Sequence, residues 1–483
     1  MATVLAAVNL LLFLALLIPL TMRFLIFALF FHCSIMVPAQ QRHFEVPMGW
    51  RGKKMELHTI SNKNKTQSCT FAVNSDSIRA FVFNRRVRLI RQFGLVRNSS
   101  EKILGGFIKD SMVYLFTKPA KDELHSYVLE IATGKIRDHY IAFDLKKEKA
   151  VENISAGDRF LYFTSNKNTS EFSIYNFTGE QQWDTLRYTF PPDRWEDLVT
   201  YQGFSPVASV KKVDLEGEAS INTAVKGNKL YPRNDTLFLV MNNHRDSTHV
   251  YSFDLENKKV NTWLIKHHEH VVPPTIAYSD NSFLLRNKLF YVIVTPDSLC
   301  IQVVDLYTGA INRSFVANRE DEISFKNTPI MQEGGQYVSG TKRELGKTKQ
   351  LLRKMVNADA VITATMNNSG QVELIVGSYA KLSAGGGDMV FASGSAMTPM
   401  VVVPTGGVTR STWLKSARFK TLLNASTFEH IEGEMNNSIN EKIEYWTADI
   451  KIPAEAENLF MTNGNYYYAY YSKGERKLII LKF

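Results

Sequence analysis

Cysteine is scarce in this chain: only Cys33, Cys69 and Cys300 occur among 483 residues. A fold held together by several disulfides is therefore excluded. If Cys33 is removed with a leader segment, two cysteines remain. Cys69 and Cys300 then either form one disulfide in an oxidising compartment or stay as two buried free thiols.

The short motifs of common enzyme classes are also missing. The sequence contains no Gly-x-Ser-x-Gly, no His-Glu-x-x-His and no repeated sialidase-type Asp box. The glycine run at 385–388 is not followed by Lys-Ser/Thr and does not follow a strand–helix unit, so it is not a phosphate loop. These absences favour a protein without catalysis of its own, and no catalytic residue, cofactor or metal centre is predicted.

Composition points to a globular protein rich in strands. Hydrophobic residues make up 45% of the chain and charged residues 22%, values typical of a protein with a real core. Aromatic residues reach 12%, which favours strands over helices. The net charge of +10 is spread over a long chain, so attraction to an anionic surface is allowed, but no nucleic-acid partner is predicted.

The N-terminal 41 residues carry one charged side chain, Arg23, which divides two apolar blocks. The first block, residues 2–20, is long enough to span a bilayer, which needs about 20 residues. The second runs from Phe24 to Val37 and is followed by Pro38-Ala39, a plausible signal-peptidase site. Residues 1–39 are therefore either a signal peptide whose functional start is Met22 or an N-terminal membrane anchor. Both alternatives predict export.

A unit of four short strands recurs along the chain. Each unit alternates apolar and polar residues and has a tight turn after its third strand. The turns are marked by Gly134, Gly179, Lys258 and Gly309, and a weaker mark lies at 213–217. Units of four strands that repeat every 40 to 50 residues or so are typical of β-propeller blades. A β-sandwich would not require a similar turn at the same place in each unit. The predicted fold is an all-β propeller of about seven four-stranded blades, with six to eight possible, formed by residues 40–483 as a single domain.

The turn segments carry a family resemblance. Glu130 to Lys135, Asn176 to Glu180 and Asp305 to Ala310 place an acidic or amide residue before a Thr-Gly turn. This pattern resembles the quinoprotein-like and Trp-Asp-type β-propeller superfamilies, and it implies a fold and no activity. The Trp that follows the turn in many quinone-binding blades is missing after Gly134 and Gly309, so no quinone is expected. The chain also looks like exported propellers of the Bacteroidota.

Several segments interrupt or close the repeat. Residues 341–356 have helical spacing with a basic face, which predicts either a surface helix packed on a blade or a helix lying on a membrane or polyanion. The Gly-rich segment 382–410 is predicted to be a mobile insertion. Residues 55–60 are expected to supply the strand that closes the ring with the C-terminal hairpin. Arg86, Arg88 and Arg91 are expected to protect an edge strand.

Two loops hold the candidate binding residues. Asp193, Trp195, Glu196 and Asp197 combine carboxylates with an aromatic ring, which suits carbohydrate stacking or, with a further carboxylate, glycosidase chemistry. His268 and His270 would share a face of a strand, so a metal would need a third ligand from elsewhere. In both cases a solvated surface loop is the alternative interpretation, and only binding is predicted.

These features favour an exported binding or scaffolding protein of a bacterial cell envelope, with a protein or glycan partner. Its expected location is the periplasm, the outer membrane or the extracellular space, or the membrane itself if residues 2–20 remain as an anchor. The alternative is an envelope or secreted hydrolase that acts on glycans or peptides at the propeller channel. The working surface is expected at one face of the ring, with 382–410 as a contact arm.

Overall fold

The computed structural model describes residues 42–50, 55–119, 123–142, 145, 147–166, 168–202, 205–213, 221–244, 246–267, 276–334, 342–367, 369–381, 414–435, 437–447 and 456–483. The predicted N-terminal segment 1–39 and insertion 382–410 lie outside these residues. Within them, no helix is long and apolar enough to cross a membrane. Nearly all of the regular structure is β-strand, as predicted.

Seven sheets of four or five strands organise the described chain, and we number them sheet 1 to sheet 7. The first three are β2 (Glu56–Ser61), β3 (Gln67–Val73), β4 (Ser77–Asn84) and β5 (Leu89–Val96); β6 (Lys102–Lys109), β7 (Met112–Lys118), β8 (Leu124–Glu130) and β9 (Ile136–Ile141); and β10 (Glu148–Ala156), β11 (Arg159–Asn166), β12 (Glu171–Phe177) and β13 (Trp183–Thr189).

The remaining sheets follow the same plan with additions. Sheet 4 holds β16 (Lys211–Lys212), β17 (Asn228–Arg233), β18 (Thr236–His244), β19 (Ser247–Asp254) and β20 (Lys259–Lys266); sheet 5 holds β21 (Ser279–Leu285), β22 (Lys288–Val294), β23 (Ser298–Asp305) and β24 (Ile311–Asn318); sheet 6 has the order β26 (Lys342–Glu344), β25 (Met331–Glu333), β29 (Leu414–Leu423), β28 (Val372–Lys381) and β27 (Asp359–Met366); sheet 7 has the order β1 (Arg42–Pro47), β32 (Lys477–Lys482), β31 (Asn465–Ser472) and β30 (Glu457–Thr462).

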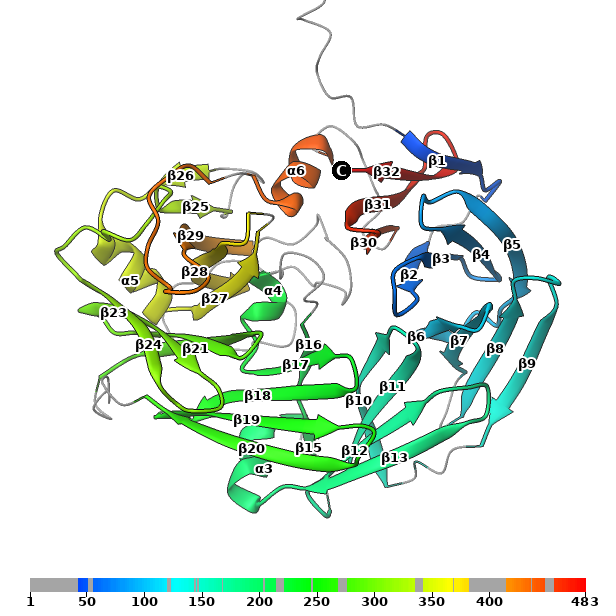
Figure 1. The fold of residues 1–483 in the computed structure, drawn as a ribbon, viewed down its shortest axis with the longest axis horizontal. Coiled ribbons are helices and arrows are strands. Elements are labelled where there is room, and N and C mark those ends of the chain that lie inside the picture. Colours follow the sequence, from blue (N-terminus) through cyan, green and yellow to red (C-terminus); the bar gives the residue numbers. More distant parts are fainter. Residues whose placement is uncertain are drawn as a thin grey trace, which may run out of the picture.

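The sheets succeed one another around a ring, with β2, β6, β10, β16, β21, β27 and β30 on the inside of their sheets (Figure 1). All strand pairs in these sheets are antiparallel except β16 with β17. Small twisted sheets bury both faces when they stack around such a ring. The molecule is therefore a β-propeller, as the repeat predicted.

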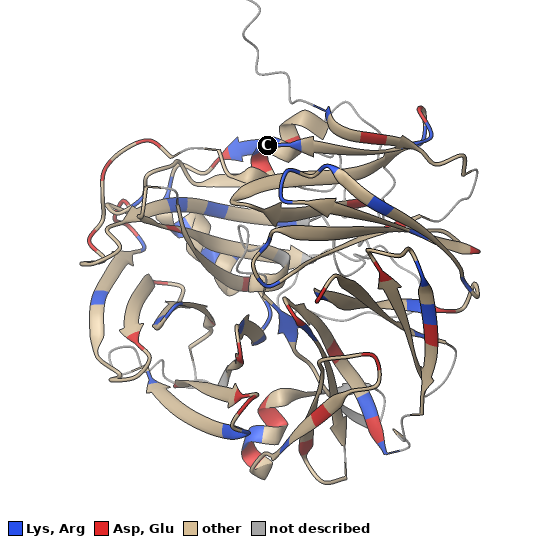
Figure 2. Cartoon of the chain, turned by 45° about the vertical axis from the view of Figure 1, so that its right-hand side comes forward, with Lys and Arg blue, Asp and Glu red and all other residues tan. Residues whose placement is uncertain are grey.

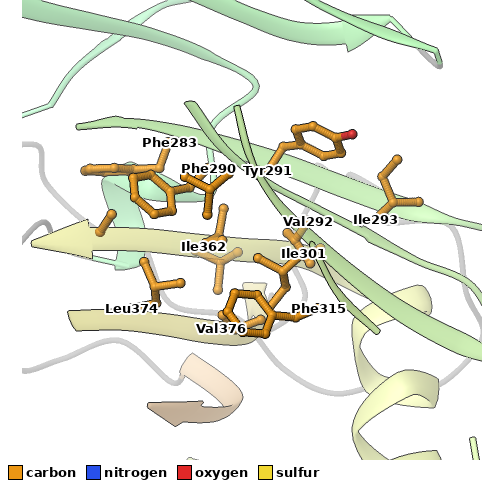
Figure 3. Packing of buried hydrophobic residues seen from close by; sticks show 14 of the residues in the cluster. Phe283, Phe290, Tyr291, Val292, Ile293, Ile301, Phe315, Ile362, Leu374 and Val376 are labelled. Atoms are coloured by element: carbon orange, nitrogen blue, oxygen red, sulfur yellow. The ribbon is translucent and has the colours of Figure 1, made fainter. Parts of the chain in front are cut away.

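The core lies between neighbouring sheets. One apolar cluster joins sheets 1 and 2, others join sheets 2 and 3, sheets 3 and 4, and sheets 7 and 1, and a large one runs through sheets 4, 5 and 6. Figure 3 shows Phe283 and Phe290 of sheet 5 beside Ile362 and Leu374 of sheet 6. Because the middle strands are covered on both faces, they are almost continuously buried, as in β11. The outer strands, such as β24, are largely exposed.

The predicted turns after the third strands are present. Gly134 and Gly309 have φ values of 80° and 70°, a region that L side chains rarely adopt. Asp305 accepts hydrogen bonds through Oδ1 from the backbone N–H groups of Tyr307 and Thr308, both at 3.0 Å. Lys288 Nζ donates to Asp305 Oδ2 at 2.8 Å, and these bonds lower the pKa of Asp305 to about 2. Asp305 therefore stabilises the turn between β23 and β24.

The ring is closed by β1, which corrects the prediction for residues 55–60. β1 pairs with β32, and Phe44 on β1 also packs edge-on against Phe83 of sheet 1, with ring centroids 4.9 Å apart. Residues 56–61 instead form β2, the innermost strand of sheet 1. The sequence prediction failed because residues 42–47 are only partly buried on the outside of sheet 7, so their apolar pattern is weak.

The long interval before sheet 4 does not hold another four-stranded unit in its described part. It contains α3 (Pro192–Leu198), the two-stranded pair β14 (Val199–Gln202) and β15 (Ser205–Ala208), β16 and the short α4 (Ile221–Ala224). Between β5 and β21, the described residues therefore form sheets 2, 3 and 4 as complete units. The edge prediction is confirmed for Arg91, which lies on β5, the outermost strand of sheet 1, whereas Arg86 and Arg88 lie in the connection between β4 and β5.

The predicted helix at 341–356 begins later than expected. α5 spans Thr348–Val356, while Lys342–Glu344 pair with β25 as β26. Leu351, Leu352 and Met355 of α5 are buried in the core beside sheet 6. Of the two predicted alternatives, α5 is therefore the helix that packs on a blade. A last helix, α6 (Ile439–Thr447), places Ile443 and Trp446 against sheet 7.

Candidate functional site

One end of the propeller gathers most of the long connections, and we call it the connection end. In every sheet the innermost strand starts there and the second strand ends there, as with Ser279 and Val294 in sheet 5. α3 lies in the connection that enters sheet 4 at this end. Lys381 and Leu414, which flank the predicted insertion, pair with each other at the same end of sheet 6.

The first predicted site forms a helix instead of a loop. Pro192 occupies the first turn of α3, where a proline is favoured because its fixed φ suits a helix and its missing N–H needs no partner. Trp195 is only 6% exposed and packs with Phe190 in the core between sheets 3 and 4. The indole therefore presents no face large enough to stack on a sugar ring, which corrects that part of the prediction.

The carboxylates around Trp195 remain at the surface. Asp193 and Glu196 are exposed, and Asp197 is half-buried with an oxygen 3.3 Å from Arg194 Nη1. Asn228 at the start of β17 donates to the backbone oxygens of Asp197 and Ser209 at 3.1 and 3.0 Å. These bonds tie the end of α3 to the innermost strands of sheet 4.

The second predicted site falls mostly outside the described residues. His268 and His270 belong to 268–275, which the structure does not describe. His267 is buried, its Nε2 lies 3.0 Å from Thr248 Oγ1, and its ring stacks on Tyr291 at a centroid distance of 4.7 Å. In the residues that are described, no group of three or more His, Cys, Asp or Glu side chains is arranged to hold a metal ion.

A buried lysine, which no motif in the sequence marks, lies at the junction of sheets 4 and 5. Lys229 on β17 is 0% exposed, and its Nζ donates to Asn281 Oδ1 at 2.9 Å and to the backbone oxygen of Ser282 at 2.8 Å. Burial lowers the pKa of Lys229 to about 7, against a smaller opposing effect of Asp280. Desolvation disfavours the charged amine, and both acceptors are neutral.

The polar contacts continue from Lys229 toward the connection end. Asn242 Nδ2 donates to Asp280 Oδ2 at 2.8 Å, and Thr248 Oγ1 donates to Asn242 Oδ1 at 2.9 Å. Ser279 Oγ accepts from the backbone N–H of Ala360 at 2.9 Å, which joins sheet 5 to sheet 6. We call Lys229, Asn242, Asp280 and Asn281, together with Asp359, which precedes Ala360, the polar seam.

Asp359 is the exposed member of the polar seam. It is the first residue of β27 and pairs with Tyr379 of β28. Desolvation by surrounding atoms raises the pKa of Asp359, and Lys226 offsets part of this rise. Burial, with a contribution from Asp359, raises the pKa of Tyr379 to about 12. Perturbed groups of this kind concentrate at functional sites, although structural networks also produce them.

Other carboxylates at the starts of innermost strands point into their own sheets. Glu101 is buried and accepts from Thr117 Oγ1 and, at 3.4 Å, from Tyr127 OH. In sheet 3, Glu148 accepts from Thr164 Oγ1 and, at 2.9 Å, from Tyr175 OH. Glu457 likewise accepts from Tyr468 OH in sheet 7. These glutamates stabilise the sheets, with a Tyr donor in all three sheets and a Thr donor in sheets 2 and 3.

The two buried cysteines are separate thiols. Neither Cys69 on β3 of sheet 1 nor Cys300 on β23 of sheet 5 takes part in a disulfide. Complete burial raises the pKa of the Cys69 thiol well above its ordinary value. Of the two alternatives left open by the sequence, the structure contains the two buried thiols.

Comparison with known proteins returns no matching family model and no matching curated sequence. Among solved structures, the chain is similar to Hsv2 of Kluyveromyces lactis (10% identity over 89% of this chain and 98% of that chain, TM-score 0.33) and to the Dos1 propeller (8% identity, 92% and 94%, TM-score 0.34). It is also similar to a chimera of ACO and RPE65 (8% identity over 56% of this chain, TM-score 0.30) and spans 64% of that chain. The propeller assignment rests on the sheet topology.

Proposed function

We propose that the chain is an exported β-propeller of about seven blades that binds or scaffolds a protein or glycan partner in a bacterial cell envelope. Sheets 1 to 7 are its blades, and residues 1–39 direct its export. The partner contacts the connection end, and Asp193, Glu196, Asp197, His268 and His270 contribute to that contact together with the polar seam.

The arrangement of the connection end carries this proposal. α3, His267 and the pair Lys381–Leu414 all lie in or beside connections at that end, so described parts of three breaks in the repeat lie on one face. Binding residues concentrate on connections held by a rigid scaffold. A binding function is favoured over hydrolysis because Glu101, Glu148 and Glu457 are used inside their sheets and do not converge on a substrate.

Site-specific photo-crosslinking in the full chain tests the location of the contact. A benzoylphenylalanine replaces Lys226, which is exposed at the connection end. The matched control replaces Arg286, which is exposed in the β21–β22 turn at the opposite end. We expect a discrete crosslinked adduct with the partner from position 226 and none from position 286. Equal adducts, or an adduct from position 286 alone, would contradict the proposed surface.

Hydrolysis is tested with the purified protein on peptide and glycan substrates. The proposal expects no turnover above the level of an Asp280→Asn, Asp359→Asn double variant. Turnover by the wild-type protein that this variant loses would instead establish the hydrolase alternative at the polar seam.

A further inference from the structure

Sheet 6 carries basic residues on both faces of β26 and β29, and the two faces differ in whether these cations are paired with carboxylates. Figure 2 shows Lys and Arg in blue and Asp and Glu in red along the strands. On one face of sheet 6, Glu333 lies 3.2 Å from Lys342 Nζ and 2.9 Å from Arg418 Nη2. Lys420 Nζ lies 2.6 Å from Glu441 of α6. The cations of this face are therefore paired.

The other face brings together four cations from three elements. Arg343 on β26 is opposite Gln332, and Gln332 is opposite Ala417, so these three residues share a face. Lys415 is two residues from Ala417 and lies on that same face. α5 packs on sheet 6 beside them and contributes Arg353 and Lys354. We call Arg343, Arg353, Lys354 and Lys415 the cationic cluster.

The described structure places no acidic partner in an ion pair with any member of the cationic cluster, in contrast to the opposite face. Arg343 Nη2 donates to the neutral Gln332 Oε1 at 3.1 Å. The sequence adds no compensation nearby, because the stretches 335–341 and 382–413, which adjoin β26 and Lys415, contain a single carboxylate, Asp388.

The four positive charges of the cationic cluster repel one another. Burial, followed by repulsion from Lys415, Arg343 and Arg353, lowers the pKa of Lys354 to about 8. An unpaired group of cations is unfavourable for the folded state, and a multivalent anion would relieve that cost. Arg offers a planar fork that fits phosphate oxygens, and Lys supplies a point charge beside it.

We propose that the cationic cluster is a binding site for a phosphate-bearing anion. Two guanidinium groups and two amines from β26, α5 and β29 surround the anion, and α5 is held in place by Leu351, Leu352 and Met355 in the core. The site shares no residue with the polar seam, and it takes a small anion instead of the proposed partner, although Lys415 follows Leu414 at the connection end.

Isothermal titration with inorganic pyrophosphate at pH 7 tests the site in the full chain. We expect the Arg343→Gln, Lys415→Gln variant to bind at least about tenfold more weakly than the wild type, because it loses two charge-assisted contacts. The control is Arg85→Gln, Arg86→Gln, which removes the same charge from the exposed β4–β5 turn and should change affinity less than about twofold. Absence of binding by the wild type, or an equal loss in both variants, would overturn the proposal.

A second readout reports on Lys354 itself and does not depend on the stability of a variant. The pKa of Lys354, followed by NMR of the methylated lysine, should rise when pyrophosphate is added, because the bound anion stabilises the charged amine. An unchanged pKa of Lys354 at saturating pyrophosphate would mean that the anion binds elsewhere and would contradict the proposed site.

A vesicle assay distinguishes a lipid headgroup from a soluble molecule as the source of the phosphate. Cosedimentation compares vesicles of phosphatidylcholine with vesicles that also contain phosphatidic acid. Retention on phosphatidic acid that the Arg343→Gln, Lys415→Gln variant loses identifies a lipid headgroup. Pyrophosphate binding without such retention identifies a soluble ligand. Retention that the variant keeps, with no pyrophosphate binding, would refute the site.

Discussion

At the scale of one residue, the burial of Lys229 makes the free energy of unfolding depend on pH. Its amine has a pKa of about 7 in the folded chain, against 10.5 when it is unperturbed. Between these two values the unfolded chain holds a proton that the folded chain has released. Stability contributed by this group therefore rises with pH across that range and is constant below about pH 7.

Replacing Lys229 with Met should remove this slope. We expect the difference in free energy of unfolding between the wild type and Lys229→Met to shift by about 2 to 3 kcal/mol in favour of the wild type from pH 7 to pH 9. The loss of donors to Asn281 and Ser282 adds an offset that does not depend on pH. Urea unfolding at several pH values measures the difference, and a constant difference would show that Lys229 does not titrate in this range.

Glu101 provides a second residue-scale prediction. Glu101→Ala leaves Thr117, His125 and Tyr127 without their shared acceptor in the interior of sheet 2, so we expect a loss of about 2 to 4 kcal/mol in unfolding free energy. Glu123→Ala, at an exposed position near the same sheet, is the control and should stay within about 0.5 kcal/mol. Similar losses in the two variants would mean that the buried network is not stabilising.

At the scale of elements, β1 and α6 connect parts of the ring that are distant in sequence. β1 belongs to sheet 7 by its pairing with β32, while Phe44 reaches Phe81 and Phe83 of sheet 1. α6 contacts sheet 7 through Ile443 and is bonded to sheet 6 through Glu441 and Lys420. Each element therefore joins two neighbouring sheets through side-chain contacts with both of them.

Truncating Phe44 should loosen this closure. Phe44→Ala removes a partly buried ring, and we expect a loss of about 1 to 3 kcal/mol, with faster hydrogen exchange in β1 and β32. The comparison variant is Tyr140→Ala on β9, where the aromatic side chain is 66% exposed. If exchange in β1 and β32 stays at the wild-type rate in Phe44→Ala, the ring does not close through this contact.

At the scale of the whole molecule, the two buried thiols report on cooperativity. Cys69 and Cys300 lie in sheets 1 and 5, and each is nearly inaccessible in the folded protein. Because apolar clusters join sheet 7 to sheet 1 and each sheet from 1 to 6 to the next, we expect both thiols to react with a maleimide at one common rate, that of global unfolding. Mass spectrometry of the labelled peptides measures the two rates.

Unequal rates would show that part of the propeller opens on its own. A mass two units lower after mild oxidation, with a peptide that links Cys69 to Cys300, would contradict the separation of the thiols. Neither outcome is expected, because both thiols are confined to the interiors of different sheets.

Much of the fold was determined by the sequence alone, because the signals involved are local. The period of two in the strands and the left-handed turns at Gly134 and Gly309 depend on neighbouring residues, so they predicted the repeated unit and the propeller. The same local reasoning placed β5 at an edge and Asp305 in a turn.

Only the tertiary structure decided which segments meet. The role of β1, the late start of α5 after β26 and the burial of Trp195 all depend on contacts between distant parts of the chain. The pKa of Lys229 and the grouping of Arg343, Arg353, Lys354 and Lys415 likewise arise from desolvation and from charges on separate elements. A periodic pattern records which side of a strand is buried, but it does not record what covers that side.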